Sequence, residues 1–128
     1  MSVLYTHIAQ KAPAASGLGD QTIYYARPVA RGVIDTQKMA WHLEKATTLS
    51  TADIQAALYG LEDMMVYYLS DGYIMRFDGV GSFRIGVSSR GVSSPDLVVP
   101  AHFRDPRILY TPAKEQKKML RTLKFERV

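Results

Sequence analysis

The longest run of apolar positions in the chain has the spacing of an α-helix. These positions recur every three or four residues: Ile54, Leu58, Leu61, Met65 and Tyr68, with Ala57, Met64 and Leu69 beside them. A stripe of this kind predicts a long amphipathic helix. Ser50 is a preferred capping residue before it, Asp53 takes the third helical position, and Gly72 suits the left-handed residue that ends a helix.

A shorter helix is predicted over residues 35–47, where Asp35 or Thr36 can cap the first turn. The apolar stripe on the longer helix is too wide for this helix and one small sheet to cover. We therefore expect a second copy of the protein to cover the remainder, since so much apolar surface is costly to leave in water. A core formed within one chain is the alternative.

After residue 72 the apolar positions alternate with polar ones, which is the pattern of β-strands. A hairpin is predicted from strands at 73–77 and 82–89, joined by a turn at 78–81 and followed by a polar loop at 90–96. Shorter patterns predict strands at 97–99 and 106–110, and a helix over 111–123 with Thr111 as its cap and Pro112 at its first position. Residues 124–128 form either a final strand or an irregular end.

The hairpin contains a pair of glycines, in the stretch DGVGSFRIG at residues 78–86. A loop that cradles a phosphate is usually followed by a helix, whereas a strand-like segment follows here. We therefore expect Gly79 and Gly81 to bend the backbone between two strands, and Phe83 to point into the core.

The beginning of the chain carries two strand patterns, at 3–9 and 22–34. An Ala-, Gly- and Ser-rich linker at 10–21 separates them. Pro28 restricts the second strand to a sheet edge or a bulge, because proline has no N–H to donate to a neighbouring strand.

The composition excludes several classes of protein. The 128 residues fit one domain with an extension, and the absence of cysteine excludes disulfides and thiolate metal sites. No apolar segment of the sequence is long enough to span a membrane. We predict no enzyme, metal, cofactor or small-molecule substrate, because the histidines are scattered and Glu62 and Asp63 diverge on their helix.

The net charge of +4 is unevenly distributed. Residues 1–33 carry three basic and one acidic residue, residues 34–83 three basic and seven acidic, and residues 84–128 ten basic and four acidic. A last third with a net charge of +6 favours an acidic partner, of which nucleic acid is the commonest. A basic surface that is merely solvated is the alternative.

Four cations share one face of the predicted last helix: Lys114, Lys117, Lys118 and Arg121. Like charges at this spacing repel one another by a few tenths of a kcal/mol per pair, roughly. Phosphates lying across the face would relieve this repulsion. The alternative is a solvated face opposite Met119, Leu120 and Leu123.

Three motifs, in this order, resemble the HU/IHF family of bacterial DNA-bending proteins. DGVGSFRI looks like the Gly-Phe-Gly-x-Phe hairpin signature of that family, and LSTADIQAAL is similar to its Leu-Ser-x-x-Asp helix opening. YTPAKEQKKML is similar to its Phe-x-Pro-Gly-Lys segment, with Lys114 at the lysine position. The segment YYARPVARGVI resembles the extension of divergent HU-like proteins of the Bacteroidetes type.

The resemblance implies an α+β fold of the HU/IHF type. Two N-terminal helices form a dimer base, followed by a three-stranded antiparallel sheet with a shortened arm and a C-terminal helix. Residues 1–33 are then an N-terminal β extension, and residues 34–128 the HU-like DNA-binding domain. The implied function is non-enzymatic binding of double-stranded DNA by a cytoplasmic, nucleoid-associated homodimer. Such a dimer reads backbone and shape with little sequence specificity, and members of this family bend the duplex.

The segment that would form the arm departs from the family pattern. It lacks the basic Arg-Asn-Pro tip, and only 16 residues separate Phe83 from Pro100. Pro95 is the candidate for insertion between bases, with a turn-forming role as the alternative. A protein of this fold that serves as a structural or protein-interaction module and has lost DNA binding is the competing interpretation. The predicted DNA-binding residues are Arg84, Arg90, Arg104, Arg107, Lys114, Lys117, Lys118 and Arg121.

Overall fold

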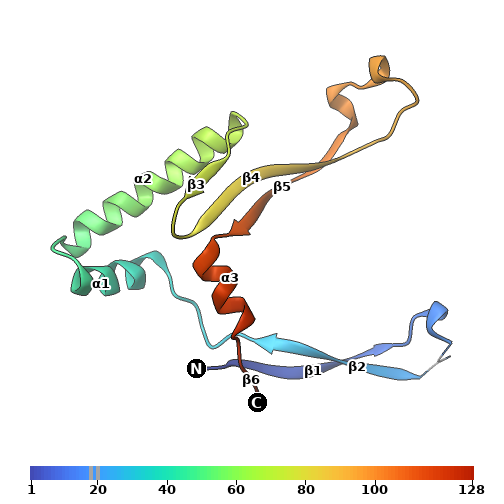
Figure 1. Ribbon diagram of the computed structural model, residues 1–128, viewed down its shortest axis with the longest axis horizontal. Coiled ribbons are helices and arrows are strands. Elements are labelled where there is room, and N and C mark those ends of the chain that lie inside the picture. The colour runs from blue at the N-terminus through green and yellow to red at the C-terminus, as the bar shows by residue number, and fades with distance from the viewer. Residues whose placement is uncertain (18, 20) are drawn as a thin grey trace. The chain divides into compact units, whose positions relative to one another are not determined.

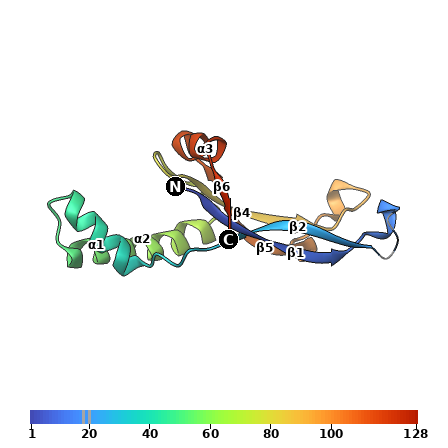
Figure 2. The same ribbon diagram turned by 90° about the horizontal axis from the view of Figure 1, so that it is seen from below.

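The computed structural model describes residues 1–17, 19 and 21–128. It contains two compact units: the first comprises Met1–Asp35 and Arg121–Val128, and the second comprises Thr36–Leu120. Figures 1 and 2 show the course of the chain from two directions. Within the described ranges, no helix combines the length and the apolarity needed to cross a membrane.

The first unit is built on a three-stranded sheet of order β2-β1-β6. Strands β1 (Val3–Lys11) and β2 (Thr22–Val29) pair antiparallel, and the short β6 (Phe125–Arg127) pairs parallel with β1. Both predicted strands are found, but the second ends at Val29 rather than at residue 34. Pro28 lies on the edge strand β2, as expected of a residue that has no N–H to donate. The predicted linker contains a 3-10 turn at Ala14–Ser16, and its residues 18 and 20 lie outside the described residues.

The two predicted helices are confirmed as α1 (Thr36–Ala46) and α2 (Thr51–Ser70). The Ser50 hydroxyl accepts a hydrogen bond from the Asp53 backbone N–H at 3.2 Å, which satisfies one of the unpaired donors of the first turn. Gly72 follows the end of α2 with φ +85°, the left-handed conformation expected of a helix-ending glycine.

The second unit contains an antiparallel sheet of order β3-β4-β5. Its strands are β3 (Met75–Phe77), β4 (Gly81–Ser89) and β5 (Phe103–Pro112), and β4 and β5 extend together as a long two-stranded arm (Figure 1). The predicted strand at 97–99 is wrong. Two 3-10 turns, Pro95–Leu97 and Pro100–His102, occupy the arm tip, because their prolines cannot donate to a β-ladder.

The last helix, α3 (Lys114–Arg121), begins later than predicted. Thr111 and Pro112 do not start it, because both belong to β5, where they pair with Ser82 and Gly81. The Ala113 carbonyl accepts the first helical hydrogen bond, from the Lys117 N–H at 3.0 Å. Pairing with a neighbouring strand has overridden the local preference of a Thr-Pro pair for a helix start.

The predicted fold class is wrong. The described part of the chain is a β-rich α+β fold with three α-helices and two sheets, and it starts with a strand rather than with two helices followed by one three-stranded sheet. The sequence indicated that the first two strands are only an extension of the domain. Instead, β1 and β2 form a separate sheet together with β6 from the other end of the chain. β6 pairs with the edge of β1 that β2 leaves unpaired.

An aromatic cluster packs one face of the β3-β4-β5 sheet. Phe83 stacks on Tyr110 with ring centroids 5.0 Å apart, and Phe77 meets Phe83 edge-on at 5.8 Å. Gly81 has φ +139°, and a Cβ atom there would lie 2.2 Å from the Thr111 carbonyl oxygen. Gly79 has open space around it. The second glycine of the motif is therefore required for the close approach of the strands. Phe83, predicted to point into the core, points into the aromatic cluster and is half-buried there.

Much apolar surface on α2 stays exposed. The buried apolar side chains of the described residues are Ala40, Ile54 and Leu69, whereas Met64 is 49% and Tyr67 71% exposed. One edge of the predicted helical stripe therefore packs within the chain, and the other edge faces outward.

Candidate functional site

A β-bulge in the arm determines where its arginines point. Gly86 is opposite Arg107, and Ser88 is opposite Arg104, so β4 advances two residues while β5 advances three. Asp105 lies in the extra stretch with φ +52°, a left-handed conformation that Asp tolerates better than most residues.

The bulge brings arginines onto one face of the sheet. In a regular strand, residues three apart point to opposite faces, which would separate Arg104 from Arg107. Because the bulge adds one residue, both share a face with Ser88, Gly86 and Arg84. Arg76 of β3 pairs with Ser82 and joins the same face. We call this surface the arginine face; its cations are Arg76, Arg84, Arg104 and Arg107.

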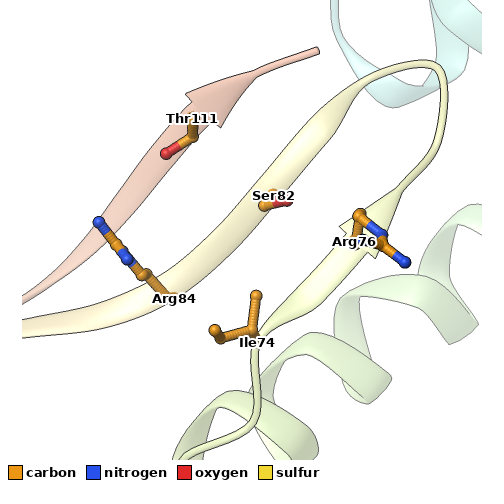
Figure 3. A pocket seen from close by; sticks show the side chains of 5 residues that line it. All are labelled: Ile74, Arg76, Ser82, Arg84 and Thr111. Carbon is orange, nitrogen blue, oxygen red and sulfur yellow. The ribbon is translucent and has the colours of Figure 1, made fainter.

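A hollow of about 540 Å³ lies on the arginine face where β3, β4 and β5 meet. It is lined by Ile74, Arg76, Ser82, Arg84 and Thr111, and Figure 3 shows the two arginines on either side of Ser82. The Arg76 Nε lies 3.8 Å from an Asp78 carboxylate oxygen, but both side chains are highly exposed, so this pair contributes little. Two guanidinium groups and two hydroxyls can together donate hydrogen bonds to an anion such as phosphate.

Arg107 is held over the bulge by hydrogen bonds. Its Nη1 donates to the Ser88 hydroxyl at 3.3 Å and to the Asp105 carbonyl at 3.2 Å. The first bond crosses from β5 to β4, which places the guanidinium above the arginine face. Part of the entropy cost of ordering this long side chain is therefore met before any ligand binds.

Helix α3 carries the predicted row of cations on its exposed side. Gln116 Nε2 donates to the Gly79 carbonyl at 2.7 Å, which ties the helix to the β3–β4 turn. By helical geometry, Lys114, Lys117, Lys118 and Arg121 lie on the sides away from Gln116, and all four are exposed. Met119 and Leu120 are each 52% exposed as well. The apolar side chains of α3 therefore do not form a buried face opposite the cations.

The remaining predicted site residues lie at the arm tip. The Arg90 N–H donates to the His102 carbonyl at 3.0 Å, closing the tip, and Pro95 starts the first 3-10 turn. Leu97 and Val98 beside it are 53% and 55% exposed. The structure thus groups Arg84, Arg104 and Arg107 on one face, whereas Arg90 and Pro95 belong to the arm tip, beyond the last paired residues of β4 and β5.

Sequence reasoning missed Arg76, Ser82 and Thr111 as members of the site. Ser82 could have been predicted from the sequence, because it lies two residues before Arg84 in the predicted strand and residues two apart share a face. The pairing of Arg76 and Thr111 with Ser82 depends on strand register, which the sequence does not display. Among the described residues, no group of three His, Asp or Glu could hold a metal ion.

Comparison with known proteins gives a matching family model and solved structures of similar fold. Residues 1–127 match the family model described as HU domain fused to wHTH, Ig, or Glycine-rich motif. A solved structure, the "Putative bacterial DNA binding protein" from Bacteroides vulgatus ATCC 8482, is similar in fold with a TM-score of 0.58 at 11% sequence identity. The match covers 100% of this chain and 49% of that one, so the chain spans about half the length of its structural neighbour. No curated protein matches the chain.

Proposed function

Because the chain belongs to the family of HU domains fused to wHTH, Ig, or Glycine-rich motifs, we propose that it is a non-enzymatic protein that binds double-stranded DNA. Binding occurs through backbone and shape, with little sequence specificity and with bending of the duplex. The protein acts as a homodimer in the cytoplasm, on the nucleoid, and resembles the divergent HU-like proteins of the Bacteroidetes type. Residues 34–128 supply the duplex-binding surface, and residues 1–33 are an extension to it.

The arginine face is the observation that carries this proposal. Among the residues paired in the β3-β4-β5 ladder, this face combines Arg76, Arg84, Arg104 and Arg107 with serine and threonine hydroxyls, and it has no carboxylate. Arginine and hydroxyl groups are the usual partners of DNA phosphates. Such contacts position the protein on the duplex without reading the DNA sequence. The cation row of α3 adds a second set of phosphate contacts.

The exposed apolar surface of the second unit supports the homodimer. Met64 and Tyr68 extend the buried stripe of α2 outward, and Ile85 and Ile108 are 43% and 59% exposed on the sheet face that carries the aromatic cluster. Contiguous apolar patches on helix and sheet are typical of surfaces that another subunit covers. A twofold copy of this same chain would bury both patches at once.

Salt dependence tests the proposed mode of DNA binding. If four arginines each neutralise one phosphate, raising NaCl from about 50 to about 200 mM lowers the duplex affinity roughly 100-fold, because bound counterions are released. Fluorescence anisotropy with a labelled duplex of random sequence measures this. A folded protein that fails to bind at about 50 mM salt would favour the interaction module without DNA binding.

A charge-matched pair of variants locates the surface. Arg84→Glu with Arg107→Glu should weaken duplex binding about 100-fold, since two attractions become repulsions on the arginine face. Arg27→Glu with Arg31→Glu changes the net charge equally in the first unit and should alter affinity less than about threefold. Equal losses in both double variants would contradict the assignment to the arginine face. Lys114→Glu with Lys117→Glu then measures the contribution of α3.

The dimer is tested separately by sedimentation. Met64→Asp places a charge on the exposed edge of the α2 stripe and should shift the protein from dimer to monomer. Glu62→Lys changes the charge on the far side of the same helix and should leave the dimer intact. A wild-type protein that sediments as a monomer at micromolar concentration would refute the homodimer.

A further inference from the structure

The sheet of the first unit has two chemically different faces. Cross-strand partners share a face, so the registers of β1 with β2 and β6 assign every paired residue. One face carries half-buried aliphatic side chains: Leu4, Ile8, Ile23 and Val29. The other, which we call the aromatic face, carries Tyr5, His7, Tyr24, Phe125 and Arg127.

The aromatic face is hollowed on both sides of Tyr5. One hollow, of about 580 Å³, is lined by Tyr5, Ala26, Pro28 and Phe125. The other, of about 350 Å³, is lined mainly by residues of this face, Tyr5, His7, Tyr24, Ala26 and Arg127, together with Thr6 and Tyr25, which the register assigns to the opposite face. Tyr5 and Ala26 belong to both, so the two hollows are neighbours along the strands. Such a surface offers adjacent places for two flat rings.

The polar groups of this face are already ordered. The His7 and Tyr24 rings meet edge-on with centroids 5.7 Å apart, and Arg127 Nη2 lies 3.2 Å from His7 Nδ1. A guanidinium can only donate, so His7 Nδ1 is the acceptor in this contact. The cation of Arg127 is thereby held beside the second hollow, while Tyr24 is 64% exposed.

We propose that the aromatic face binds unpaired nucleotides of a single-stranded nucleic acid. Bases stack on Tyr5, Tyr24 and Phe125, and Arg127 and Lys11 pair with the phosphates between them. The charge of the face favours a nucleic acid. Among its paired residues, Lys11 and Arg127 are the charged side chains, and there is no carboxylate. A proline-rich peptide would use the aromatic rings but would gain nothing from the two cations.

This site is separate from the proposed duplex surface. All its residues belong to the first unit, whereas the arginine face belongs to the second. Each surface can therefore be disabled while the other is kept, and failure of one assignment leaves the other standing.

The test uses the full chain carrying Arg84→Glu and Arg107→Glu, so that the duplex surface does not mask weaker binding. A labelled oligothymidine of about 20 nucleotides is the probe, read by fluorescence anisotropy. Tyr24→Ala should weaken its binding about tenfold, because one stacked base is lost. Tyr24→Phe keeps the ring and should restore affinity. Tyr59→Ala is the matched control, because Tyr59 is a 53% exposed tyrosine of the second unit and lines neither hollow.

Three results would overturn the proposal. The first is no binding of oligothymidine by the folded protein at low salt. The second is an equal loss from Tyr24→Ala and from the control Tyr59→Ala. The third is a polyproline peptide that binds the face while oligothymidine does not. In the wild-type background, Tyr24→Ala should leave duplex affinity within about twofold, which separates this site from the duplex surface.

Discussion

The two three-stranded sheets of this protein use the same residue types in opposite ways. In the β3-β4-β5 sheet, Phe77, Phe83 and Tyr110 pack against one another while the arginines occupy the other face. In the β2-β1-β6 sheet, Tyr24 and Phe125 are more than 60% exposed and share their face with Arg127. An aromatic residue on a strand is therefore evidence of a core only when something covers that face.

The difference arises from what lies next to each sheet. Helix α2 contacts both β3 and β4, so part of the second sheet has a cover within its own unit. In the first unit, none of the described residues is fully buried. The first sheet is thus held by its backbone ladder and half-buried aliphatic side chains, and Tyr24 and Phe125 on its aromatic face stay exposed.

The largest expected effect is at the closest strand approach in the second sheet. Gly81→Ala should lower the free energy of unfolding by about 4 kcal/mol, since the new Cβ meets the Thr111 carbonyl and the backbone conformation is strained. Gly79→Ala is the control, because open space surrounds that residue, and it should change stability by less than about 1 kcal/mol. Urea denaturation followed by circular dichroism measures both. Equal stabilities would show that β4 and β5 are farther apart than described.

The same substitution in each sheet gives a direct comparison of the two aromatic faces. Phe83→Ala removes a ring packed between Phe77 and Tyr110 and should cost about 3 kcal/mol of stability. Phe125→Ala removes a ring that is 63% exposed and should cost less than about 1 kcal/mol. Thermal and urea unfolding of the two variants measure these losses in the free energy of unfolding. A similar cost at both positions would mean that the aromatic face of the first sheet is covered in the folded protein.

Local signals in the sequence were sufficient for most elements. Ser50 and Gly72 marked the ends of α2 because capping depends on residues within a few positions of each other. The alternation of apolar and polar residues located β4. Because proline has no N–H to donate, Pro28 was expected at a sheet edge or a bulge, and it lies on an edge strand. The start of α3 was misplaced, because Thr111 and Pro112 resemble a helix start locally but pair with β4 at long range. The arrangement of sheets was likewise missed, since β6 pairs with β1 across almost the whole chain.

The sequence by itself determined the periodicities, the caps, the basic last third and the family signature around Gly81 and Phe83, because each is a property of neighbouring residues. Tertiary structure alone decided which cations share a face of the sheet. Arg104 and Arg107 are three apart and would point to opposite faces of a regular strand. The bulge at Asp105 turns them to one side, and strand register brings Arg76 beside Arg84. Such placement depends on pairing between distant segments, and no local pattern encodes it.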